Sequence, residues 1–126
     1  MDYLYYPGCS LEGTASEYDI SCRELFRILG DHLTDIPDWT CCGATAAQCV
    51  DAFLSVVLPA RNLALAEKTD TGLDVLVPCS ACYLNLKKAR QDLLENSALK
   101  ARVNQVLKPD ELAVLHPCGS GICWMC

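Results

Sequence analysis

The stretch GLDVLVPCSAC at residues 72–82 carries the strongest strand signal of the chain and decides its fold. Leu73–Val77 is a short apolar run between a glycine and a proline, which is typical of a buried strand. A long helix is predicted from Ser80 onward, so Cys79 and Cys82 fall on a strand-to-helix turn. A strand that passes directly into a long helix is typical of α/β proteins.

The same alternation of strands and helices extends to both sides of this stretch. Short strands are predicted at residues 4–6 and 33–36, and helices at residues 45–58, 61–68 and 97–107, with Pro59 as a kink or a new helix start and Ser97 as a cap. An amphipathic helix between the first two strands has its caps and apolar stripe at Ser16, Gly30, Tyr18, Cys22, Leu25, Phe26 and Leu29. We therefore predict an α/β domain with a small, largely parallel sheet and flanking helices.

Three groups of cysteines each follow a predicted strand. They are Cys9, the pair Cys41-Cys42, and Cys79 with its neighbour Cys82. The turns at the carboxyl ends of parallel strands lie at one edge of a sheet, where α/β folds build their sites. We therefore expect these cysteines to converge in space, although they are far apart in the sequence.

The composition is that of one globular domain. The chain has 126 residues, of which 52% are hydrophobic and 21% charged, and its net charge of -6 argues against nucleic-acid binding. No apolar run approaches the roughly 20 residues of a membrane-spanning helix. The first residues lack the basic and apolar regions of a secretory signal, so we expect a cytoplasmic protein without a transmembrane segment.

Ten cysteines in a chain of this size require an explanation. A secreted disulfide scaffold fits poorly, because such scaffolds are poor in core residues whereas this chain has long periodic apolar segments. In a reducing compartment, clustered thiols more often hold metal or perform redox chemistry. The C-x-x-C pair Cys79 and Cys82 alone is compatible with a zinc site, a redox dithiol or a cluster.

The adjacent pair Cys41-Cys42 is more informative. Neighbouring side chains on an extended backbone point apart, so both can bind one centre only at a sharp turn or on a large polynuclear target. Gly43 supplies conformational freedom at this point, and Pro7-Gly8 forms a second turn just before Cys9.

The remaining cysteines and histidines have weaker claims to a site. Cys22 and Cys49 are interpreted as buried apolar residues on helices, and His32 and His116 have no partner at metal-ligand spacing. The tail cysteines Cys118, Cys123 and Cys126 match three of the four ligand positions of plant-type ferredoxins. The fourth ligand would have to come from elsewhere, so this spacing is either a second metal site or accidental.

The cysteine pattern resembles the cysteine-rich CCG domain found in the B subunit of heterodisulfide reductase and in iron–sulfur subunits of some oxidases. Cys9 is followed after 31 residues by Cys41-Cys42-Gly43, and Cys42 after 36 residues by Cys79 and Cys82. The segments YYPGCSLEG and VPCSACY resemble the first half of that B subunit in particular, and the resemblance covers about residues 2–107.

This resemblance implies a specific cofactor and reaction. The five cysteines Cys9, Cys41, Cys42, Cys79 and Cys82 would hold a non-cubane 4Fe-4S cluster built from two fused units. The implied activity is that of an oxidoreductase subunit that reduces a disulfide such as that of coenzyme M and coenzyme B. Partner subunits with iron–sulfur clusters and flavin would deliver the electrons. A non-catalytic electron-transfer module and a structural zinc domain are the alternatives.

The family arrangement has two such domains in tandem, whereas this chain has one copy of the pattern. We expect residues 1–108 to form the cysteine-rich domain. Residues 109–126 would be a tail, or the truncated start of a linker to a second domain, and residues 110–126 would be poorly ordered.

Overall fold

The computed structural model describes residues 2–8, 16–43, 51–69, 73–114 and 122–124. In chain order, its elements are β1 (Asp2–Tyr5), α2 (Ser16–Ile28), β2 (His32–Asp35), α4 (Leu54–Thr69), β3 (Asp74–Val77), α5 (Ser80–Glu95), α6 (Ser97–Leu107), the 3-10 helix η1 (Lys108–Asp110) and β4 (Ile122–Trp124). None of the helices in these described ranges is long and apolar enough to cross a membrane.

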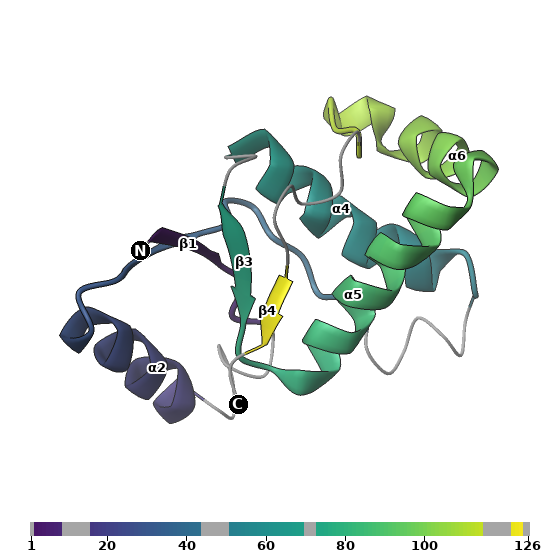
Figure 1. Cartoon of the computed structure of the whole chain (residues 1–126). Helices are drawn as coiled ribbons and strands as arrows, with labels where there is room; N and C mark the ends of the chain where they lie inside the picture. The colour runs from purple at the N-terminus through teal and green to yellow at the C-terminus, as the bar shows by residue number, and fades with distance from the viewer. Residues whose placement is uncertain (1, 9–15, 44–50, 70–72, 115–121, 125–126) are drawn as a thin grey trace.

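The four strands form one sheet in the order β2-β1-β3-β4, and every neighbouring pair is parallel. Figure 1 shows α2 on one side of the strands and α4, α5 and α6 on the other. The three strands predicted from the sequence are therefore present, and the predicted α/β class with a small parallel sheet is confirmed. Parallel strands with covered faces are buried, which explains their apolar sequences.

Alternate residues of the strands face opposite layers of helices. Leu4, Val75 and Val77 belong to the main core, which they share with apolar side chains of α4 and α5 such as Leu63 and Leu86. Residues between them face the other way, because side chains alternate along a strand. Tyr5 accordingly meets α2, where its hydroxyl donates to Asp19 at 2.8 Å and the Arg23 guanidinium lies 4.5 Å from its ring centre.

Helix α2 buries less of its apolar stripe than the sequence predicts. Cys22 is buried and Phe26 packs edge-on against Tyr3, but Tyr18, Leu25 and Leu29 are 41%, 45% and 62% exposed. The strands beneath this helix are only four residues long, so they offer too little surface for the whole stripe. The predicted end of the helix is confirmed, because Asp31 donates to the Phe26 carbonyl and Gly30 to that of Arg27, a Schellman ending.

Two helix starts differ from the prediction. Asp51–Phe53 form a turn rather than helix, and α4 begins at Leu54 and runs through Pro59 without a break, while residues 45–50 lie outside the described ranges. Helix α6 is capped by Asn96 rather than Ser97, because the Asn96 side chain accepts from the Leu99 amide at 3.0 Å. An amide oxygen one position earlier reaches the free N–H groups of the first turn.

The tail is more ordered than the sequence predicts. Leu112 and Val114 are buried in the core, and the Asn104 side chain brackets Val114 by accepting from its N–H at 2.7 Å and donating to its carbonyl at 3.1 Å. Strand β4 pairs with β3, with Leu76 opposite Cys123. The expectation of poor order is therefore wrong for residues 110–114 and 122–124, while the domain boundary at residue 108 stays a prediction.

Candidate cysteine-rich metal site

Two sulfurs from distant parts of the sequence meet at the carboxyl edge of the sheet. Cys42 lies in the loop after β2 and Cys82 in the first turn of α5, yet their Sγ atoms are 3.3 Å apart. Cys42 is 1% and Cys82 6% exposed, so this pair of thiols is shielded from water. The strands β2, β1 and β3 are parallel neighbours, which brings the loops that follow them to one edge.

The segment that leads to Cys9 reaches the same place. Gly8 has a φ of +80°, and a Cβ added there would lie 3.0 Å from the Cys82 Sγ and 3.9 Å from the Cys79 Cβ. A side chain at position 8 would therefore press on the sulfur, and the backbone approaches it this closely only because residue 8 is glycine. Cys9 itself lies outside the described residues.

The turn after β2 has the sharp geometry that adjacent cysteines need. Gly43 adopts a φ of +74°, and its N–H donates to the Cys41 Sγ at 3.4 Å. Cys41 is exposed whereas Cys42 is buried, so the two sulfurs of the pair have different access to solvent. The conformational freedom predicted for Gly43 is thus used in the structure.

The electrostatics of the paired thiols favour a bound cation. The hydrogen bond with Cys42, burial, and the negative charge of Cys42 and Cys79 when ionised all raise the pKa of the Cys82 thiol well above its ordinary value. Two buried thiolates in contact repel each other unless a positive ion lies between them. A metal centre supplies this charge, and thiolate is the form of cysteine that binds metal.

The donor set therefore fits a thiolate-bound metal centre at this edge. Cys42, Cys79 and Cys82 lie together, Cys41 follows on the same loop, and Gly8 brings the chain to Cys9. Within the described ranges, no group of three His, Cys, Asp or Glu side chains is arranged to hold a metal ion. The assignment of all five cysteines as ligands stays a prediction.

A polar side chain that the sequence analysis missed contacts one of these sulfurs. The Asn85 amide nitrogen lies 3.7 Å from the Cys42 Sγ and donates to it. Asn85 also lines a hollow of about 160 Å³ between α4 and α5, together with Ser55, Lys88 and Asp92, so it separates this hollow from the sulfur. Its position three residues after Cys82 on a helix could have indicated the contact, because residues i and i+3 share a face.

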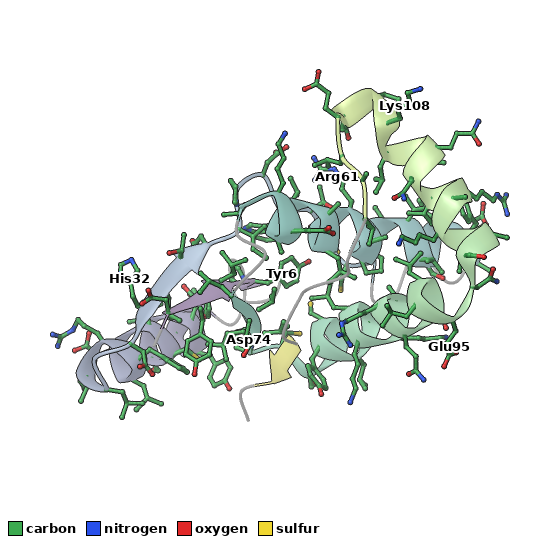
Figure 2. The ribbon with its side chains drawn as sticks, turned by 45° about the horizontal axis from the view of Figure 1, so that its top comes forward. Tyr6, His32, Arg61, Asp74, Glu95 and Lys108 are labelled. Atoms are coloured by element: carbon green, nitrogen blue, oxygen red, sulfur yellow. The ribbon has the colours of Figure 1, made fainter. Side chains whose placement is uncertain are left out.

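The other candidates from the sequence lie elsewhere or are not described. Cys22 is buried on α2, on the opposite face of the sheet from the core that contains Cys42 and Cys82. Figure 2 shows His32 at the outer end of the molecule, away from the buried Tyr6, and it begins β2 rather than following it. The residues Cys49, His116, Cys118 and Cys126 fall outside the described ranges, and Cys123 is placed only by its strand register.

Comparison with known proteins connects this geometry to a family. The sequence model of the CCG family, described as a cysteine-rich domain, matches residues 3–87. This range contains all five predicted ligands and the strands β1, β2 and β3 that position them.

Three curated proteins are similar to most of the chain. An 8-methylmenaquinol:fumarate reductase membrane anchor subunit from Wolinella succinogenes is 41% identical over 84% of this chain and 36% of its own length. A protein from Archaeoglobus profundus, named as like the B subunit of heterodisulfide reductase, is 32% identical over 85% of this chain and 36% of its own. The B subunit of a ferredoxin/F(420)H(2)-dependent CoB-CoM heterodisulfide reductase from Methanosarcina acetivorans is 33% identical over 82% and 34%. The chain thus spans about a third of each relative.

One solved structure shares the fold. The crystal structure of a hypothetical protein from Helicobacter pylori superposes with a TM-score of 0.79 over 96% of this chain and 24% of that one. The two sequences are 19% identical, so this likeness concerns the arrangement of strands and helices alone.

Proposed function

Because the chain belongs to the CCG family of cysteine-rich domains, we propose that it is an iron–sulfur redox module. The observation that carries the proposal is the contact between the buried Cys42 and Cys82 sulfurs, at the edge where the chain also delivers Cys79 and Gly8. The proposed ligands are Cys9, Cys41, Cys42, Cys79 and Cys82.

The proposed cofactor is a non-cubane 4Fe-4S cluster, and the proposed reaction is reduction of a disulfide, such as that of coenzyme M and coenzyme B. Two of the similar proteins carry heterodisulfide reductase in their names, which supports this choice. A cluster held by the cysteines supplies one-electron redox chemistry. Partner subunits with iron–sulfur clusters and flavin are part of the proposal, since the chain corresponds to about a third of these relatives.

The residues of this chain have separate tasks in such a module. The buried pair Cys42 and Cys82 provides sulfur ligands shielded from water, which keeps the local dielectric low. Asn85 donates a hydrogen bond to the Cys42 sulfur and stabilises negative charge on it. The hollow beside Asn85 is the described cavity that comes nearest to this sulfur through a single side chain, and it gives a small polar substrate a place to approach.

A second candidate is an electron-transfer module that never touches a disulfide. The relative with 41% identity is named as a membrane anchor subunit of a fumarate reductase, and this name describes no disulfide chemistry. A structural zinc site using four of the cysteines is a third candidate, since zinc binds thiolates equally well.

Metal analysis after anaerobic purification separates these candidates. We expect brown protein with about four iron and four sulfide per chain and little zinc, as a 4Fe-4S cluster requires. Colourless protein with stoichiometric zinc would establish the structural alternative. If iron is present, adding a disulfide to the reduced protein should change the cluster spectrum, whereas an electron-transfer module would show no such response.

Replacing Asn85 with leucine is expected to lower the reduction potential of the bound cluster. The N–H donor at 3.7 Å from Cys42 favours the more negative, reduced form, so its loss shifts the potential downward. A shift on the order of tens of mV is expected, since about 59 mV is a tenfold change for one electron. Redox titration measures it. The control is Gln91→Leu on the same helix, whose amide contacts Glu95 at the surface, and an equal shift there would contradict the assignment.

A further inference from the structure

The segment before Cys41 and the segment before Cys9 are joined by one buried amide. Asn62 on α4 is 1% exposed and is the buried polar side chain among the described residues. Its Oδ1 accepts from the Thr40 N–H at 2.8 Å and from the Thr40 hydroxyl at 3.4 Å. Its Nδ2 donates to the Thr40 carbonyl at 2.8 Å and to the Tyr6 hydroxyl at 3.2 Å. Both donors and both acceptor positions of the amide are thus in use.

Tyr6 closes this network from the other side. Its hydroxyl donates to the Thr40 carbonyl at 2.6 Å, so this carbonyl accepts from both Tyr6 and Asn62. The Tyr6 ring also packs edge-on against Trp39, with the ring centres 5.3 Å apart. Figure 2 shows Tyr6 in the interior of the molecule, where it follows β1.

The sequence positions of these residues give the network its meaning. Thr40 directly precedes Cys41-Cys42, and Tyr6 stands three residues before Cys9. Asn62 holds both of these segments, although no contact of its side chain with a cysteine is described. Removing this amide would take away the acceptor that the described residues give the Thr40 N–H, and a buried group of that kind is costly to leave unpaired.

We propose that Asn62 is a positioning residue that fixes the two cysteine-bearing segments relative to each other and so sets the geometry of the metal site. Asn62 acts through Thr40 on Cys42 and through Tyr6 on the segment that leads to Cys9. This role deepens the proposed function and rests on it for the identity of the metal alone, because the network is formed by the protein itself.

The structure offers a matched control for this role. Asn104 on α6 also brackets a backbone residue with both ends of its amide, accepting from Val114 N–H at 2.7 Å and donating to its carbonyl at 3.1 Å. Its partner lies in the tail rather than next to a cysteine loop. Asn62→Leu and Asn104→Leu therefore remove the same kind of clamp, one beside the predicted site and one remote from it.

The test measures how fast iodoacetamide labels Cys42 and Cys22 in the full chain after anaerobic removal of metal, with the fold verified by circular dichroism. Cys22 is buried against the other face of the sheet, so opening of the whole domain exposes both thiols and leaves the ratio of their rates unchanged. Loosening of the Thr40 segment raises the rate at Cys42 alone. Peptide mass spectrometry reads both rates in one sample.

We expect the Cys42-to-Cys22 ratio to rise at least about tenfold in Asn62→Leu and to stay at the wild-type value in Asn104→Leu. Tyr6→Phe removes one hydroxyl and should raise the ratio by a smaller factor, and it decides the matter if Asn62→Leu does not fold. An unchanged ratio in the folded Asn62 variant, or an equal rise in Asn104→Leu, would overturn the proposal. Wild-type protein that binds no iron would overturn the proposed function instead, and the labelling ratio would still test Asn62.

Discussion

Cys82→Ser is expected to remove most of the iron that the protein binds. The Cys82 sulfur lies 3.3 Å from that of Cys42 and against the backbone of Gly8, so it occupies the centre of the predicted site. A serine hydroxyl stays protonated at neutral pH and is a poor substitute for a thiolate ligand. We expect iron per chain to fall by most of the wild-type amount, as measured by metal analysis of anaerobically purified protein.

Cys22→Ser is the matched control for this substitution. It makes the same chemical change at another buried free thiol, on α2 at the opposite face of the sheet. We expect full iron content and a loss of roughly 1 to 2 kcal/mol in the free energy of unfolding, the usual size for one core substitution. If Cys22→Ser lost as much iron as Cys82→Ser, the division of the ten cysteines into ligands and core residues would be wrong.

The convergence of the cysteine loops could be predicted because it depends on topology. A sequence in which strand, turn and helix alternate predicts parallel strands, and parallel strands place their following turns at one edge. The structure confirms this edge for Cys42, Cys79 and Cys82. The sharp turns at Gly8 and Gly43 were also predictable, because glycine is the residue that adopts a positive φ without strain.

The depth of burial of each helix could not be predicted in the same way. The 3.6-residue period of α2 marks an apolar stripe but carries no information on the area of the surface beneath it. Strands of four residues cover Cys22 and part of Phe26, and they leave Leu25 and Leu29 exposed. The tail was misjudged for the opposite reason, because pairing of β4 with β3 depends on contacts far apart in sequence.

The amides that support the site were missed for a chemical reason. Asparagine is most often a surface or turn residue, so a sequence gives it no special role in a helix. A signal was nevertheless present at Asn62, because the residues three and four positions before and after it are all apolar: Leu58, Pro59, Leu65 and Ala66. An amide on an apolar helix face indicates a buried hydrogen-bonding partner, and here that partner is Thr40.

Deleting residues 112–126 is expected to unfold the protein or bring it close to unfolding. Leu112 and Val114 are buried, and full burial of such side chains contributes about 1.5 to 3 kcal/mol each. The deletion also removes the backbone partners of Asn104 and the strand that pairs with β3. Since domains are stable by only about 5 to 15 kcal/mol, the sum is a large share of the total. Urea denaturation followed by circular dichroism should show a sharply lower midpoint or no transition.

Iron content of that deletion therefore cannot reveal what the tail cysteines do, and a gentler variant is needed. Changing Cys118, Cys123 and Cys126 together to serine keeps the backbone that forms β4 and leaves Leu112 and Val114 in place. We expect this triple variant to bind as much iron as the wild type, because the five predicted ligands all precede residue 83. A substantial fall in iron, with an unchanged urea midpoint, would show that the tail cysteines hold a centre of their own, as their ferredoxin-like spacing allows.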